Sequence, residues 1–124
     1  MKNTFDYIDA NTQRYIDFLC KICSFEARAY DKETIDSMVD YIVSFAQAEG
    51  FTVMRKPMEK CGDFLTVEIN PGGEKGCLFH AHMDTVHEKG AFGEPAVRIL
   101  EDRITGPGVI DCKGGIAIGF LCMK

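Results

Sequence analysis

The sequence predicts an α/β fold, and two observations lead to this prediction. Apolar residues recur at helical spacing in two segments near the amino terminus, over residues 11–23 and 32–49. Further along, short runs are apolar or alternate between apolar and polar residues, over residues 51–54, 63–69 and 77–81. Such runs are typical of strands. The 124 residues are the usual length of one domain, so we expect a single mixed domain.

Two polar residues mark the starts of the predicted helices. Asn11 is placed to cap the helix over residues 11–23, and Asp31 to cap the helix over residues 32–49. Gly50 suits the left-handed conformation that often ends a helix. A third helix is predicted over residues 116–123, and it is apolar on nearly every side, which predicts burial inside a larger body. Because no cap or covering strand follows it, we expect the sequence to be a piece of a longer protein.

The predicted strands are separated by turn-forming residues. Residues 70–76 (NPGGEKG) break the chain between the strands over 63–69 and 77–81. Two shorter arms, over residues 97–100 and 103–105, predict a hairpin that turns at Glu101 and Asp102.

Composition and charge exclude several classes of protein. Apolar residues make up 46% of the chain, which is enough to build a core without staples. The formal net charge is −5, with no basic run, which argues against nucleic acid or an anionic membrane as a partner and favours a small or peptidic ligand. The amino terminus has no apolar signal region, and no run approaches the ~18 apolar residues of a spanning helix. We therefore expect a cytoplasmic protein.

Six cysteines are present, at a density below that of small secreted scaffolds, so we expect buried, reduced thiols. Cys20 and Cys23 form a CxxC motif inside a helical pattern. Packing in the core is the interpretation we favour there, and a redox or zinc role is the alternative.

The densest polar cluster follows the predicted strand over residues 77–81. It contains His80, His82, Asp84 and His87. Alternation along a strand would send the first three to one side. A histidine with a carboxylate two residues on has the elements of a metal ligand and its hydrogen-bonded partner. The other interpretation is a strand end whose imidazoles bond to the backbone.

Asp111 is a second carboxylate of interest, because it stands between a Gly-Pro-Gly loop and an apolar helix. A charge at such a place is stabilised by a cation. The alternative, which the sequence alone favours, is that Asp111 caps the following helix. Lys113 would be its ion-pair partner or a solvated side chain.

Two stretches together resemble a known family. LFHAHMDTVHEKGAF (78–92) and GPGVIDCKGGIAIG (106–119) resemble the zinc aminoacylase and carboxypeptidase superfamily, and glutamate carboxypeptidase in particular. Their order and separation are similar to those of the family, and the resemblance extends back to about residue 11. It implies a three-layer α/β sandwich with a central mixed sheet. Residues 1–124 would then be the amino-terminal part of the catalytic, zinc-binding domain, without the lid or dimerisation domain.

The resemblance also implies roles for individual residues. His82 would ligate one zinc ion, Asp84 would act in catalysis by orienting His82, and Asp111 would bridge two zinc ions, with a cis peptide bond to Cys112. Gly114 and Gly115 would let the backbone pass close to the site. Co²⁺ or Mn²⁺ would be possible substitutes for Zn²⁺.

The implied activity is that of a di-zinc hydrolase that releases an amino acid from a peptide or an N-acyl amino acid, in an enzyme that can form a homodimer. The general-base glutamate and the remaining metal ligands would lie beyond residue 124. We therefore expect the chain alone to be inactive and to bind metal weakly, because two direct ligands are fewer than the usual three or four.

Three residues depart from the family pattern, namely Ala81, His87 and Cys112. None of them removes a ligand. Two alternatives from other classes remain: a non-catalytic metal-binding or interaction module, whose uncovered apolar faces would drive association, and a thiol enzyme that uses Cys112 or Cys61.

Overall fold

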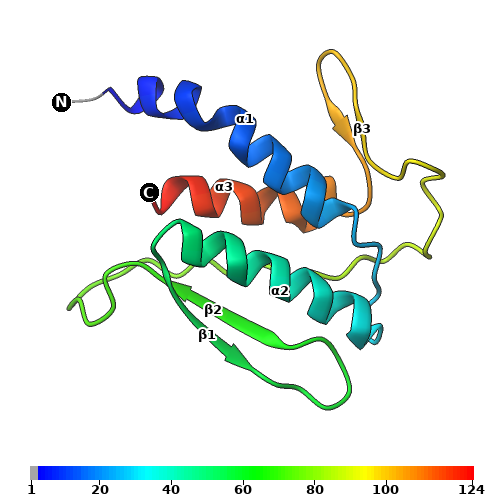
Figure 1. Ribbon diagram of the computed structural model, residues 1–124, viewed down its shortest axis with the longest axis horizontal. Coiled ribbons are helices and arrows are strands. Elements are labelled where there is room, and N and C mark those ends of the chain that lie inside the picture. The colour runs from blue at the N-terminus through cyan, green and yellow to red at the C-terminus, as the bar shows by residue number, and fades with distance from the viewer. Residues whose placement is uncertain (1–2) are drawn as a thin grey trace.

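The computed structural model describes residues 3–124 and shows helices packed together, with two small hairpins at their sides (Figure 1). In chain order the elements are α1 (Thr4–Cys23), α2 (Lys32–Ala48), β1 (Thr52–Lys56), β2 (Phe64–Glu68), β3 (Arg98–Ile99), β4 (Ile104–Thr105), the irregular helical turn η1 (Val109–Lys113) and α3 (Gly114–Cys122). Helix α3 lies between α1 and α2 in Figure 1, and β1 packs against α2. The structure therefore combines helices with two small antiparallel sheets, which is compatible with the predicted α/β class.

Helix α1 begins at Thr4, seven residues before the predicted start at Asn11. Asn3 is its cap, and the side-chain oxygen of Asn3 accepts a hydrogen bond from the Phe5 amide at 3.2 Å. The side chain of Asn11 instead donates to the Tyr7 carbonyl one turn earlier. The start was missed because the first turns of α1 are largely exposed, with Phe5 71% exposed, so they add little to the buried stripe by which periodicity detects a helix.

Helix α2 confirms the prediction from its local signals. The Asp31 carboxylate accepts a hydrogen bond from the Thr34 amide at 3.2 Å. The helix ends at Ala48, and Gly50 has a positive φ of 83°. The predicted apolar stripe is buried on this helix, apart from partly exposed Val43.

The strands predicted over residues 51–54 and 63–69 and the hairpin predicted over residues 97–105 are present, and the pairing of the first two strands is an additional finding of the structure. Strands β1 and β2 pair antiparallel, with Thr52 opposite Glu68 and Lys56 opposite Phe64. Strands β3 and β4 pair antiparallel over two residues each, and the Leu100 amide donates to the Arg103 carbonyl across their turn.

The predicted strand over residues 77–81 is wrong. These residues belong to no strand, and the side chains of Leu78 and Phe79 are 92% and 64% exposed. An apolar run becomes a buried strand only where neighbouring strands accept its backbone hydrogen bonds. Within residues 3–124 no strand pairs with this segment, and the two sheets are separate antiparallel pairs. The implied central mixed sheet, and the three-layer sandwich with it, are therefore not found in this part of the chain.

The core forms where the three α-helices meet. The rings of Phe18 on α1 and Phe45 on α2 stack with centroids 4.1 Å apart, and Phe120 on α3 meets both edge-on at 5.4 and 5.7 Å. Aromatic pairs in such geometries stabilise a core beyond the area they bury. Only one face of α3 is covered, because Ile118 is 63% exposed. Enclosure of this helix on all sides is therefore not seen among the described residues.

The cysteines are free, as predicted, but most are not buried. Cys23 lies in the core, where burial raises the pKa of its thiol to about 11, so core packing accounts for this residue. Cys77 and Cys122 are exposed. Across residues 3–124, the helices are too short or too polar to span a lipid bilayer.

Candidate metal centre

His82 and Asp111 meet in space although 28 residues separate them along the chain. The Nε2 atom of His82 lies 2.8 Å from Oδ1 of Asp111. On the other side of the ring, Nδ1 of His82 lies 3.2 Å from Oδ1 of Asp84 and 3.1 Å from the Asp84 carbonyl oxygen. The structure therefore brings together the three residues singled out in the sequence, with the imidazole held between two carboxylates.

The two carboxylates raise the pKa of His82 above its ordinary value. The hydrogen bond with the Asp111 side chain is the largest favourable cause, and the negative charge of Asp84 adds to it, while partial burial acts in the opposite direction. The side chains of His82 and Asp111 are 44% and 71% exposed. The pair is therefore a site with excess negative charge that remains open to ions and ligands from solvent.

Cys112 holds the main chain of His82. Its Sγ atom accepts a hydrogen bond from the His82 amide at 3.2 Å and donates one to the His82 carbonyl at 3.3 Å. The donor atoms of His82, Asp111 and Cys112 all lie within 4.8 Å of one another. Cys112 was not predicted as a member of this donor cluster, although its place beside Asp111 in the sequence was the signal that it would reach it.

These contacts also bear on the thiol-enzyme alternative. An activated cysteine needs a base within hydrogen-bond reach of its sulfur. The thiol of Cys112 contacts the main chain of His82 rather than its ring. Cys61 lies in the loop between β1 and β2 and is not a member of the donor cluster found in the described residues. The structure therefore does not favour a cysteine–histidine nucleophile.

The backbone of η1 positions Asp111. Gly108 enters the turn with a positive φ of 72°, and Asp111 and Cys112 have non-helical backbone angles. The Asp111–Cys112 peptide bond is cis, as the resemblance implies. Helix α3 has Lys113 at its N-cap position and no side-chain cap hydrogen bond. The helix-capping interpretation of Asp111 is therefore wrong, and its carboxylate is available to the His82 imidazole.

Lys113 is neither solvated nor paired with Asp111, contrary to both predictions. Its side chain is fully buried, and Nζ donates to the Phe25 carbonyl at 2.8 Å. Burial lowers the pKa of this ammonium, while the negative charges of Asp84 and Glu26 act in the opposite direction. Lys113 therefore ties the turn that carries Asp111 to the chain that follows α1.

Residues 25–28, which follow α1 and include Phe25, also bind the segment that follows His82. The Ala27 carbonyl accepts hydrogen bonds from the Thr85 amide at 2.7 Å and from the Thr85 hydroxyl at 3.1 Å. The Glu26 carboxylate accepts from the Gly90 amide at 2.9 Å. Arg28 forms an ion pair with Glu88. Residues 25–28 thus form a common support for both halves of the site.

The remaining histidines lie outside the donor cluster. His80 is exposed, and the cluster found in the described residues does not include it. His87 contacts the ring of Phe92 edge-on, with centroids 5.1 Å apart. The alternation that was expected to align His80 with His82 and Asp84 is not present because residues 77–81 form no strand.

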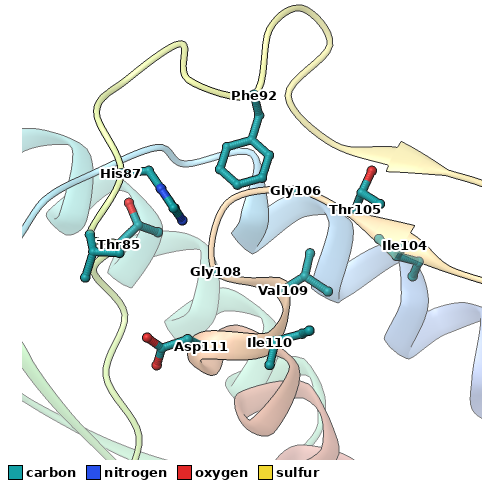
Figure 2. Close-up of a pocket in the computed structure, with 11 residues that line it drawn as sticks. Thr85, His87, Phe92, Ile104, Thr105, Gly106, Gly108, Val109, Ile110 and Asp111 are labelled. Carbon is teal, nitrogen blue, oxygen red and sulfur yellow. The ribbon is translucent and has the colours of Figure 1, made fainter.

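A cavity of about 320 Å³ opens beside Asp111. It lies between the loop that follows His82 and the segment that leads from β4 into η1 (Figure 2). In Figure 2 the side chains of His87 and Phe92 extend toward Val109 from across the cavity, and Asp111 lies at its edge. The cluster and the cavity therefore share one residue.

No protein-family model matches the sequence. Over 111 residues the chain is 33% identical to carboxypeptidase G2 of Pseudomonas sp. (strain RS-16). The chain resembles a carboxypeptidase. The match covers 88% of the chain but 27% of the relative, so the chain spans about a quarter of that enzyme's length. The similarity therefore concerns this part of that carboxypeptidase.

Proposed function

We propose that this chain supplies part of the zinc site of a carboxypeptidase-like or aminoacylase-like hydrolase. His82 and Asp111 are the metal ligands in this proposal, and Asp84 orients His82. The observation that supports it is the 2.8 Å approach of Nε2 of His82 to the Asp111 carboxylate, with a carboxylate also at Nδ1. The proposed substrates are peptides or N-acyl amino acids, from which an amino acid is released. A homodimer, no nucleic-acid partner and a cytoplasmic location belong to the same proposal.

The donor chemistry fits a zinc ion. Zinc is held by imidazole nitrogen and carboxylate oxygen, and both are present. A ligating histidine almost always donates its other ring N–H to a carboxylate or carbonyl, which fixes its tautomer. Asp84 offers both groups to Nδ1 of His82. Asp111, with its two carboxylate oxygens, is the residue proposed to bridge two ions, and Co²⁺ or Mn²⁺ would be accepted by the same donors.

Each residue would have a distinct task in hydrolysis. Bound zinc would polarise the amide carbonyl and make a water molecule more acidic. Asp84 would keep the His82 ring oriented so that its Nε2 could bind the ion, and the negative charge of Asp111 would balance the charge of that ion. The support from residues 25–28 keeps the two ligands at a fixed separation.

Metal titration of the 124-residue chain tests the assignment. Calorimetry with Zn²⁺ is expected to show weak binding, because two direct ligands are fewer than zinc sites usually have. His82→Ala and Asp111→Asn are expected to remove this binding. His80→Ala is the matched control, since His80 is an exposed histidine outside the cluster, and it is expected to leave binding unchanged.

Two results would count against the proposal. Tight, stoichiometric zinc uptake by the chain would contradict the predicted ligand number, and undiminished uptake by His82→Ala would remove the site altogether. In a complete hydrolase that contains these residues, the same two substitutions are expected to abolish release of amino acids from N-acyl substrates, so near-normal turnover in either variant would overturn the catalytic role.

A further inference from the structure

We propose that the cavity beside Asp111 binds an uncharged, apolar side chain or acyl group of the substrate, on the side of the scissile amide away from the free carboxylate. This inference rests on the proposed function, because it assumes that the reacting amide lies at the His82–Asp111 pair. Apart from Asp111, the residues to which it assigns a substrate preference are not used by the proposed metal site.

The location of the cavity supports this assignment. Asp111 lines the cavity and also contacts Nε2 of His82. An amide carbonyl held beside this pair would have one of its two substituents next to the cavity opening. The cavity and the metal site thus adjoin at Asp111, which lies at the edge of the cavity in Figure 2.

The chemistry of the walls indicates what the cavity would accept. Most of the lining side chains are apolar or aromatic, and the polar ones are threonines, His87 and Asp111. The lining residues are Thr85, Val86, His87, Phe92, Ile104, Thr105, Gly106, Gly108, Val109, Ile110 and Asp111. Among these described residues none is a lysine or an arginine. A carboxylate would therefore lose its hydration, gain no cation and be repelled by Asp111, whereas an apolar group would be desolvated favourably.

The size of the cavity limits the group that fits. A volume of about 320 Å³ is at the lower end of the range of roughly 300–1,000 Å³ that is usual for small-molecule sites. A single side chain of the leucine or phenylalanine class suits this volume better than a longer peptide segment. His87 meets Phe92 edge-on at an interplanar angle of 81°, so this pair forms an aromatic wall for such a group.

The test uses two probes and the metal-free 124-residue chain. N-acetyl-L-phenylalanine amide is the uncharged probe, and the α-amide of N-acetyl-L-glutamate is the charged one. In NMR titrations the uncharged probe is expected to shift the signals of Val109 and Phe92 but not those of Ile118, which lies on the exposed face of α3. The charged probe is expected to bind more weakly by about tenfold or more.

Val109→Phe fills the cavity and is expected to weaken binding of the uncharged probe by about tenfold or more. Ile118→Phe is the matched control, because it adds an aromatic ring outside the cavity, and it is expected to leave binding unchanged. If Val109→Phe fails to fold, the shift map of the unsubstituted chain decides the question. Equal binding of the two probes, or shifts confined to other residues, would overturn the proposal.

The outcomes distinguish this inference from the proposed function. Zinc binding that depends on His82, without any response of Val109 to the uncharged probe, would reject the cavity assignment alone. Binding of the probe at Val109 without any zinc binding would retain an apolar site but reject its place in a metallohydrolase.

Discussion

Gly114 and Gly115 are neighbours in the sequence, yet only one of them needs to be glycine. A Cβ atom on Gly114 would lie 2.4 Å from the carbonyl oxygen of Val109, a backbone atom that cannot move aside without distorting η1. A Cβ atom on Gly115 would meet nothing within 4 Å. The resemblance implied a close backbone approach at both residues, and the structure confirms it for Gly114 only.

Gly114→Ala and Gly115→Ala are therefore expected to have opposite effects on the free energy of unfolding. Gly114→Ala should destabilise the chain by about 1–3 kcal/mol, as overpacking typically does. Gly115→Ala should be neutral or should stabilise it by up to about 1 kcal/mol, because alanine is the better helix former. Urea denaturation of both variants measures the difference. Equal destabilisation would show that η1 does not approach α3 in the manner described.

At the scale of secondary-structure elements, Asp63 connects the first hairpin to α2. Its carboxylate accepts hydrogen bonds from Lys32 on α2 at 2.6 Å and from Arg55 on β1 at 2.7 Å. The Met58 amide donates to the same group at 3.0 Å, and the Asp63 amide donates to the Asp36 carboxylate. The pairing with Lys32, the backbone bond from Met58 and the pairing with Arg55 hold the pKa of Asp63 far below its ordinary value. Asp63 thus links the hairpin to the helix.

This lowered pKa predicts a loss of stability in acid. A carboxyl whose native pKa is depressed contributes stability above its unfolded pKa of about 4 and loses it as the pH falls through the native value. Thermal unfolding followed between neutral pH and pH 2 is expected to show this loss for the unsubstituted chain and a shallower pH dependence for Asp63→Asn. Asp102→Asn is the control, because Asp102 is exposed and its partner among the described residues is its sequence neighbour Arg103. An identical acid response of Asp63→Asn and the unsubstituted chain would contradict the role of Asp63.

At the scale of the whole molecule, residues 25–28 hold segments that are far apart in sequence. They bind Thr85 and Gly90 on one side of the site and Lys113 on the other. A Cβ atom on Gly108 would lie 3.1 Å from Thr85 and 3.2 Å from Lys113, so the three residues are closely packed. The distance between His82 and Asp111 depends on this support as well as on their direct contact.

Thr85→Val tests the support that residues 25–28 provide, because valine has nearly the same shape as threonine. It removes the hydroxyl that donates to the Ala27 carbonyl, while the Thr85 amide continues to donate to the same oxygen. The expected loss is about 1 kcal/mol in the free energy of unfolding, the usual contribution of one hydrogen bond. Thr12→Val is the control, because its exposed hydroxyl bonds within α1, and its effect should stay within about 0.5 kcal/mol. If Thr85→Val leaves stability unchanged, the hydroxyl does not contribute to the support.

Much of the fold was predictable where the signals are local. The bounds of α2, its Asp31 cap and the turn at Gly50 followed from periodicity and capping chemistry, which act over a few residues. The prediction failed at residues 77–81 because strand formation depends on partners elsewhere in the chain. It also failed at the start of α1, where exposed turns leave no apolar pattern.

For the candidate site, too, some features were predictable from local sequence and others depended on the tertiary structure. The sequence by itself determined which side chains were candidates: residue type and spacing indicated the cluster of His80, His82, Asp84 and His87, and the family resemblance implied that His82 and Asp111 are ligands. Only the tertiary structure decided that His82 and Asp111 meet, that Cys112 holds the His82 main chain and that Lys113 is buried against Phe25. Residue chemistry and helical period are local properties, whereas contacts between distant segments result from the packing of the whole chain.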